Sequence, residues 1–389
     1  MIKTTVFDVL IVYSDGLSSS ASSLSEGVSE PFAKGSDIES YNIVYGYFLK
    51  RCQRNKLTVA FTTSSDIIGP GKCKSYWLFE KNTWIKVRKT GYSTVIFDKF
   101  SPVTKLARIK RDLLFSSSAI KPFNHPDIFN LFFDKQKAYT KLSKFSIPTV
   151  TIENSTSNNI RRACKKLQAI VAKHIHKSDF SDEIVMKDRF GAGGLNVYKF
   201  KKGQEKNMKD SMEKNIDISY IIQPFAKFDK GFRYRNIPVS TDIRFIYLGG
   251  KIIQTYLRMA KTGEFRCNEH QGGLLKYIPK NDMPLDVVSV SNKIAKILDK
   301  KCSLYALDFI ISNNGNIYLL EGNTGPGLDW NLSMKENEIE AQKLIEIIVK
   351  QLTKLAKPTV KTTKKEDQFV IPHSSIDEYS TAPIMQISA

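Results

Sequence analysis

The sequence lacks the segments and motifs that would place it in several large protein classes. No run of about 18 apolar residues occurs, which argues against a transmembrane helix. The five cysteines are scattered without a C-x-x-C pair, so we expect neither a disulfide framework nor a zinc site. A Gly-x-Ser-x-Gly motif is absent, and so is any block of five or more consecutive basic residues. These absences argue against a membrane protein, a zinc protein and a serine hydrolase.

What is present is the composition of an ordinary soluble protein with an unusual charge. The 389 residues are 41% hydrophobic and 25% charged, and this length favours two or three domains. Lysine and arginine number 59 against 39 acidic residues, which gives a net charge of +20. This charge favours anionic partners, whether a nucleotide, an acidic peptide or nucleic acid, but the lack of a consecutive basic block favours compositional drift in a chain rich in Lys, Asn and Ile. The charge alone therefore selects no function.

The first residues and the cysteines indicate a compartment. Residues 1–13 carry Asp8 within an apolar stretch and lack a small-residue cleavage site, so they are typical of a first β-strand rather than a signal peptide. Scattered cysteines suit a reducing environment. We therefore expect a cytoplasmic protein without a membrane partner, and nucleic acid is not an expected partner either.

The order of patterns along the chain predicts an α/β (α+β) protein of three parts and a tail. Residues 1–120 alternate strand-like and helical runs, as in a Rossmann-like domain. Residues 121–222 contain a helix and a strand that runs into a glycine loop, and residues 223–356 contain two hairpins and two helices. Residues 357–389 are polar and aperiodic, so we expect a disordered tail. A serine-rich stretch at 14–20 is either a ligand cradle after the first strand or a flexible loop.

The last predicted hairpin places two carboxylates opposite each other. Its strands flank Asn314-Gly315, a dipeptide typical of a two-residue type I′ turn. Counting outward from that turn pairs Asp308 with Glu321, and Asn323 shares the strand face of Glu321. Facing carboxylates destabilise a buried sheet unless a cation lies between them, and carboxylate and amide oxygens suit Mg²⁺. The alternative is a pair of solvated edge acids, but the apolar residues around both strands favour the metal site.

Another predicted hairpin turns at Gly249-Gly250 and carries two arginines. Arg244 shares a strand face with Asp242, two residues before it. A two-residue loop would place Arg258 on the opposite face, unless the hairpin contains a bulge. The register of this hairpin therefore decides whether both arginines reach one site.

Between residues 127 and 355 the chain carries an ordered set of short motifs. They are Val-Met-Lys before a glycine loop, Gln-Pro-Phe, Asp-Ile-Arg, Arg-Cys-Asn, Leu-Asp-Phe and Leu-Glu-Gly-Asn-Thr-Gly-Pro-Gly. As an ordered set they resemble the ATP-grasp superfamily. The resemblance is strongest to the branch of ribosomal-protein glutamate ligases, lysine-biosynthesis carrier ligases and bacterial glutathione synthetase. It implies two α+β subdomains that grip ATP, preceded by the Rossmann-like domain.

The resemblance also implies a role for each motif residue. The residues around ATP would be Lys135, Lys187, Gly191, Gly193, Gly194, Gln223, Pro224, Phe225, Asp242, Arg266 and Asn268. Within this set the lysines would flank the nucleotide, the glycines would close over the β- and γ-phosphates, and the Gln-Pro-Phe backbone would contact adenine. The catalytic arginines would be Arg244, Arg258 and Arg266. The magnesium ligands would be Asp308, Glu321 and Asn323, in agreement with the hairpin count.

The function implied by the resemblance is an ATP-dependent carboxylate–amine ligase that works through an acyl phosphate. Such a reaction needs positioning and charge neutralisation rather than a nucleophilic side chain. Its cofactors would be ATP and two Mg²⁺ ions, with Mn²⁺ as a substitute. Its partners would be small-molecule or peptide carboxylates and amines, and we expect a dimeric or tetrameric homo-oligomer. Two other classes stay open: an ATP-grasp kinase of a phosphorylated polyol, which a net charge of +20 would suit, and a non-catalytic ATP-binding module that regulates a partner.

Overall fold

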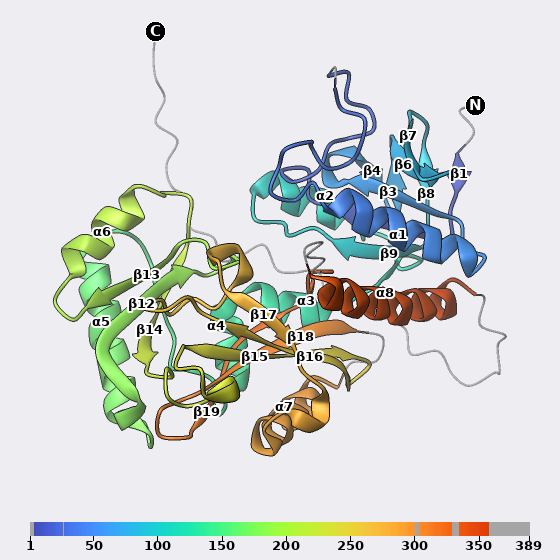
Figure 1. Cartoon of the computed structure of the whole chain (residues 1–389). Helices are drawn as coiled ribbons and strands as arrows, with labels where there is room; N and C mark the ends of the chain where they lie inside the picture. Colours follow the sequence, from blue (N-terminus) through green and yellow to red (C-terminus); the bar gives the residue numbers. More distant parts are fainter. Residues whose placement is uncertain (1–3, 26, 300–302, 329–333, 358–389) are drawn as a thin grey trace, which may run out of the picture.

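A computed structural model describes residues 4–25, 27–299, 303–328 and 334–357, whose strands form four sheets (Figure 1). Beyond residue 357, the predicted tail lies outside the described residues. Short 3₁₀ helices are η1 (Ser64–Asp66), η2 (Lys177–Asp179), η3 (Tyr234–Asn236), η4 (Glu269–Gln271) and η5 (Lys280–Asp282). Within the described residues, no helix combines the length and the apolar character needed to cross a membrane.

The first part of the chain folds around a six-stranded sheet of order β10-β9-β2-β3-β6-β7, in which β10, β9, β2 and β3 are parallel. Its strands are β2 (Val9–Tyr13), β3 (Val59–Thr63), β6 (Tyr76–Glu80), β7 (Thr83–Val87), β9 (Val95–Lys99) and β10 (Lys121–Pro122). Alternate residues of β2 enter two different cores, because successive side chains of a strand point to opposite faces. The helices beside this sheet are α1 (Tyr41–Arg54) and α2 (Lys105–Leu114).

A small sheet packs beside α2 and shares a core with the second face of β2. Its strands are β1 (Thr5–Val6), β8 (Gly91–Tyr92), β5 (Lys72–Cys73) and β4 (Ile67–Gly69). The parallel strands are therefore buried on both faces, as expected for an α/β architecture.

The middle of the chain forms a four-stranded antiparallel sheet that we call the lid. Its strands are β11 (Val150–Ile152), β14 (Tyr220–Ala226), β12 (Phe180–Asp188) and β13 (Val197–Lys201). The helices α5 (Ser157–Ala172) and α6 (Glu205–Glu213) cover one face, into which Ile184 and Met186 of β12 point. The other face carries Val185 and Lys187. Two helices precede the lid: α3 (Pro126–Phe133) and α4 (Lys135–Leu142).

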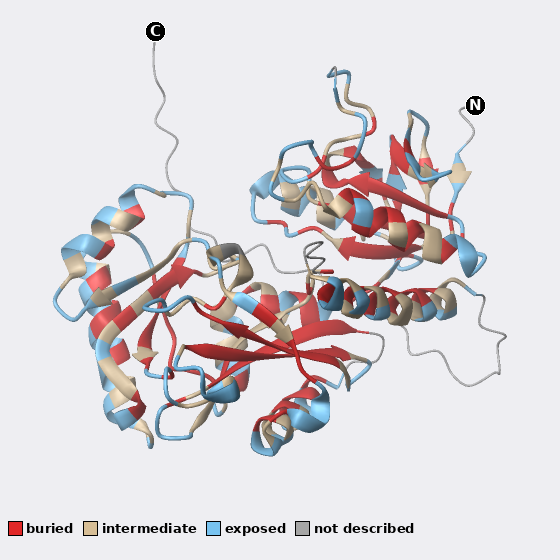
Figure 2. Cartoon of the chain, in the orientation of Figure 1, coloured by how far each residue is buried: buried red, intermediate tan, exposed pale blue. Residues whose placement is uncertain are grey.

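The last part of the chain is a five-stranded antiparallel sheet of order β17-β16-β15-β18-β19. Its strands are β15 (Thr241–Leu248), β16 (Lys251–Met259), β17 (Leu274–Tyr277), β18 (Leu304–Ile311) and β19 (Ile317–Asn323). One face packs on α3, α4 and α7 (Leu285–Leu298). On the other face, α8 (Lys335–Ala356) packs against both this sheet and the first part of the chain. Figure 2 shows these strands buried along most of their length.

The β18–β19 hairpin has the predicted pairing but not the predicted turn. Ser312 donates its backbone N–H to the Asn316 carbonyl at 2.8 Å, and only Gly315 within the turn has a positive φ, of 86°. The loop therefore has three residues rather than the two of a type I′ turn. A bulge at Leu320 then restores the register, so that Asp308 does lie opposite Glu321. The extra loop residue and the bulged residue each shift the register by one place, in opposite directions, so the predicted pairing of Asp308 with Glu321 is correct.

The β15–β16 hairpin contains the bulge on which the position of Arg258 depends. Gly249 and Gly250 both have positive φ, of 58° and 76°, as a two-residue type I′ loop requires. Beyond the loop the register shifts at Ile253, so Arg258 pairs with Asp242. Arg258 therefore shares the face of Arg244, and the placement expected for a regular hairpin is wrong.

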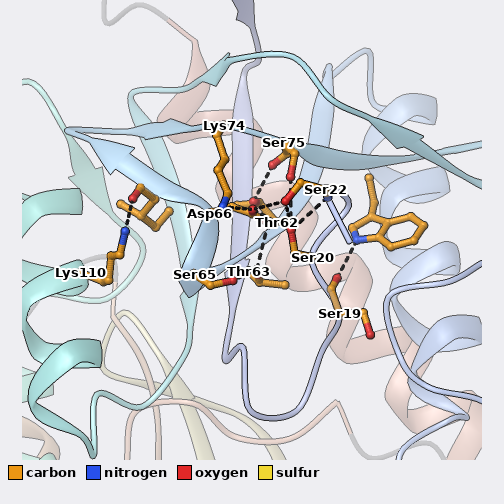
Figure 3. A network of polar contacts seen from close by, with 12 residues as sticks. Ser19, Ser20, Ser22, Thr62, Thr63, Ser65, Asp66, Lys74, Ser75 and Lys110 are labelled. Carbon is orange, nitrogen blue, oxygen red and sulfur yellow. Dashed lines mark hydrogen bonds and ion pairs between the residues drawn. The ribbon is translucent and has the colours of Figure 1, made fainter. Parts of the chain in front are cut away.

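The serine-rich loop after β2 is part of a packed polar network (Figure 3). The Asp66 carboxylate, whose residue is fully buried, accepts hydrogen bonds from Ser20 at 2.7 Å and from Thr63 at 2.9 Å. Trp77 donates to the backbone carbonyl of Ser19 at 2.9 Å. These bonds satisfy a buried carboxylate and hold the loop across the end of the sheet. The ligand cradle at residues 14–20 stays a prediction.

We predict that Gly231→Ala destabilises the protein strongly. A Cβ at Gly231 would lie 1.8 Å from the Ile311 carbonyl oxygen, so one of the two backbones must move. We expect a loss of about 1–3 kcal/mol and a fall in melting temperature of several degrees. Gly16→Ala is the matched control, because nothing lies within 4 Å of its Cβ position. Equal melting temperatures for the two variants would contradict this packing.

Candidate active-site cleft

A cleft of about 840 Å³, its open mouth included, lies between the lid sheet and the five-stranded sheet. Most of the residues predicted from sequence line it: Lys135, Lys187, Gly191, Gly194, Gln223, Pro224, Phe225, Asp242, Arg258, Arg266, Asn268 and Glu321. The other predicted residues, Gly193, Arg244, Asp308 and Asn323, do not contribute to its lining.

Four buried side chains form a row of alternating charges beneath the cleft. Arg244 binds Asp308 through two hydrogen bonds of 2.5 Å each. Arg258 bridges Asp308, at 2.7 Å, and Asp242, at 2.8 and 2.9 Å. Each charge therefore has an opposite neighbour, without which burial would be costly.

The two acids of this row differ in their pKa values. Burial raises the pKa of Asp308, but Arg244 and Arg258 together hold it below its ordinary value. Burial raises the pKa of Asp242 to about 6, although Arg258 opposes the shift. Asp308 is therefore the more firmly ionised of the two.

Two lysines face Glu321 from the lid side of the cleft. Burial lowers the pKa of Lys187 to about 8, against the opposing effect of Glu321. Burial also lowers the pKa of Lys135, whose ammonium donates to the Gly191 carbonyl. An anion between these lysines would restore their protonated forms, so this end of the cleft is suited to phosphate.

The oxygen donors of Asp308, Glu321 and Asn323 fit Mg²⁺, and the charges around them favour metal binding together with a nucleotide. The side-chain carboxylate of Glu321 makes no hydrogen bond within the described part of the chain. Asn323 Oδ1 accepts from the Gly325 N–H at 2.8 Å. Asp308 Oδ1 accepts from one arginine N–H and so keeps a lone pair. These are hard oxygen ligands of the kind that Mg²⁺ prefers. Because two guanidinium groups border Asp308, a cation there needs the phosphates of a nucleotide to offset their charge.

The glycine loop between β12 and β13 rests against the Arg266–Asn268 segment. Gly194 has a φ of 75°, and a Cβ there would lie 2.8 Å from Asn268 Oδ1. Gly193 also has a positive φ, of 70°. Arg266 Nε is buried and has no hydrogen-bond partner among the described residues. The same guanidinium pairs with Glu264 at 3.6 Å through Nη2, so the Nε–H is the part of Arg266 that lacks a partner among the described residues.

The far end of the cleft is aromatic and apolar. The Gln223 side chain donates to Thr149 at 2.7 Å, so its backbone rather than its amide is available to a ligand. The pairing of β14 with β11 stops at Ile222, one residue before Gln223. The edge of Gln223 that faces β11 therefore has no strand partner. Phe225 packs edge-on against Phe265, with ring centroids 5.7 Å apart. This wall suits a flat base, and the sequence reasoning did not identify Phe265.

An ion pair that the sequence reasoning also missed joins α4 to the glycine loop. Arg189 binds both carboxylate oxygens of Asp134, at 2.7 and 2.6 Å. Asp134 is also the N-cap of α4 and accepts from the Gln136 N–H at 2.9 Å. An Asp before a lysine-rich helix signals a cap. The pairing of Asp134 with Arg189, which is 55 positions away, cannot be predicted from the neighbouring sequence.

A protein-family model matches the part of the chain that builds this cleft. The family model for the RimK-like ATP-grasp domain matches residues 134–348, more than half of the chain. The chain belongs to this ATP-grasp family. The predicted resemblance and the predicted ATP-grasp fold are confirmed.

Curated relatives of this ATP-grasp protein are named as ligases. A probable alpha-L-glutamate ligase from Hydrogenovibrio crunogenus is 29% identical over 37% of this chain and 41% of its own length. A second, from Legionella pneumophila, is 34% identical over 36% of this chain and 40% of its own length. The chain thus spans about two fifths of the length of these relatives.

Solved structures share the ATP-grasp fold at low identity. D-alanyl-alanine synthetase A from Vibrio cholerae has a TM-score of 0.54 and 14% identity, and the match covers 92% of this chain and 99% of that one. D-cycloserine synthetase has a TM-score of 0.53 and 12% identity, with coverage of 87% and 99%. At such identities the likeness concerns the fold alone.

We predict that metal-free ADP binding takes up a proton above pH 8. The pKa of Lys187 is about 8 because of burial, and a bound phosphate raises it. ADP affinity should therefore fall by up to about tenfold per pH unit above pH 8. Calorimetry at pH 8.5 in two buffers of different ionisation enthalpy measures the uptake.

Lys187→Arg is the control for this measurement, because a guanidinium keeps its proton across the range. We expect that variant to retain its charge and to show a smaller buffer dependence, with the remainder due to Lys135, whose pKa is also lowered by burial. Equal heats in both buffers for the unaltered protein would contradict the assignment.

Proposed function

We propose that this chain is an ATP- and Mg²⁺-dependent carboxylate–amine ligase that forms an amide bond through an acyl phosphate. One observation supports the proposal: lysines and arginines line the cleft around Glu321, and Arg258 of that lining pairs with the buried Asp308 beside it. The Cys267 thiol in the lining has its pKa raised by burial and donates to a backbone carbonyl, so it is no nucleophile. A cleft built from charges is suited to phosphoryl transfer by positioning and neutralisation.

The residues divide the chemistry between them. A substrate carboxylate oxygen attacks the γ-phosphorus and ADP leaves, while Lys135, Lys187 and Arg266 neutralise the phosphate oxygens. Asp308, Glu321 and Asn323 would hold Mg²⁺, which adds charge neutralisation at the phosphates when bound.

In the second step the amine attacks the acyl carbon, phosphate leaves and the nitrogen loses a proton. Arg258, which lines the cleft while it is paired with Asp242 and Asp308, would supply positive charge to the developing oxyanion. The lid and its glycine loop exclude water from the acyl phosphate, which would otherwise hydrolyse.

For the substrate we propose an amino acid or a peptide, with L-glutamate as the first candidate. The names of the matched relatives support this choice. We also propose a cytoplasmic location, which the buried free thiols of Cys52, Cys73, Cys164 and Cys267 would suit.

One assay tests the proposal: purified protein with ATP, Mg²⁺, L-glutamate and a pool of peptides. A ligase releases phosphate only when both an acid and an amine are present, and mass spectrometry detects the amide. ADP with a phosphorylated polyol and no amine dependence would indicate a kinase instead. Nucleotide binding without turnover would indicate a binding module.

We predict that Glu321→Gln lowers turnover by about 10²–10³-fold or more while the fold is retained, because a charged ligand is lost next to the phosphates. Manganese bound in the presence of ATP, followed by electron paramagnetic resonance, should fall in parallel. Glu80→Gln, at an exposed strand position in the first part of the chain, serves as the control. Full activity in Glu321→Gln would contradict the metal site.

A further inference from the structure

A buried carboxylate outside the cleft joins the lid to the β18–β19 hairpin. Asp179 stands just before β12 and is 2% exposed. Its carboxylate accepts hydrogen bonds from Asn314 at 2.7 Å, Asn316 at 2.9 Å and Tyr318 at 2.5 Å. All three donors belong to the hairpin that carries Asp308 and Glu321. Burial alone would raise the pKa of Asp179, but these bonds hold it below its ordinary value, so the carboxylate is ionised.

The same hairpin turn also holds the strand by which the chain leaves the lid. Lys227, which follows β14, donates its N–H to the Asp179 carbonyl at 3.1 Å, and its own carbonyl accepts from Asn313 at 2.8 Å. Lys230 donates its N–H to Asn313 Oδ1 at 2.8 Å. The start of β12 and the end of β14 are therefore fixed to one turn.

Aromatic packing and a close backbone contact complete this junction. Phe180 and Tyr318 have ring centroids 5.6 Å apart, and His174 lies 5.2 Å from Phe180. Gly231 lies so close to Ile311 that no side chain fits between them. This close approach requires glycine at position 231.

The junction and the glycine loop lie at opposite ends of the same lid strand. Strand β12 runs from Phe180, next to Asp179, to Asp188, where the glycine loop starts. At that far end Arg189 and Gly191 contact Asp134 and Lys135. A rotation about the junction would therefore move the glycine loop most and the junction least.

We propose that Asp179 and Tyr318 are positioning residues that fix the pivot about which the lid closes over bound nucleotide. Because β19 runs from Tyr318 to Glu321, the pivot also sets where Glu321 stands relative to the closing loop. The inference rests on the nucleotide-binding part of the proposed function, but not on the ligase chemistry.

Tyr318→Phe tests the pivot, because it removes one hydrogen bond and keeps the ring. The matched control is Tyr247→Phe. Tyr247 lies in the same sheet, its hydroxyl is buried and bonded to Ser291 at 2.7 Å, and it contacts α7 instead of the lid. Tyr318→Phe loses a hydrogen bond to a carboxylate, and Tyr247→Phe loses the bonds to Ser291 and to Asn292, the latter at 3.2 Å, so both variants should be less stable than the unaltered protein.

The decisive readout is hydrogen exchange of residues 189–196 with and without a non-hydrolysable ATP analogue and Mg²⁺. We expect the analogue to slow exchange in the unaltered protein and in Tyr247→Phe. In Tyr318→Phe most of this protection should be lost, and the analogue should bind about tenfold more weakly. Asp179→Asn, which removes the charge that the three donors face, should behave in the same way.

The outcomes separate the pivot from the ligase. Protection that Tyr318→Phe retains in full would overturn the pivot alone. Protection lost in Tyr318→Phe, with no amide formed by the unaltered protein, would support the pivot and reject the ligase. No protection in the unaltered protein would overturn both the pivot and the nucleotide site.

Discussion

The structure depends most on the burial of four charges in one row of an antiparallel sheet. Asp242, Arg258, Asp308 and Arg244 are each no more than 6% exposed, and each has an opposite charge beside it. Removing one member would leave an uncompensated buried charge, a change that typically costs about 3–5 kcal/mol. The sheet must therefore keep all four side chains on one face, and its register is constrained accordingly.

This row also determines how the cleft receives a ligand. The arginines are occupied by aspartates, whereas Lys135, Lys187 and Arg266 are less fully compensated. The positive wall of the cleft is thus made by β12, the start of α4 and the segment after β16, and Glu321 supplies the negative charge that faces the two lysines. A polyphosphate with its cation complements both walls at once, while either ion alone meets one favourable and one unfavourable wall.

Much of the cleft could be predicted from the sequence, because the resemblance to the ATP-grasp superfamily implied most of its lining residues, and strand spacing separately indicated the carboxylate pair. The facing of Asp308 and Glu321 came from a turn signal and a count, although the turn has three residues and Leu320 bulges. Arg258 could not be placed, since no local pattern marks a bulge in an apolar run such as Lys251-Ile252-Ile253. Contacts between distant segments, such as that of Asp179 with Tyr318, could not be predicted, because each partner alone is an ordinary polar residue.

The two bulges have a consequence for sequence length in this family. Ile253 and Leu320 are the residues that their partner strands skip, so losing either one would leave Arg258 opposite Asp242 and Glu321 opposite Asp308. Losing a residue of the partner strand instead, where no bulge can absorb the change, would slide every residue beyond it by one place and exchange the inner and outer faces. Natural insertions and deletions in these hairpins should therefore gather at the bulges and the turns, so an alignment gap there need not signal a lost site.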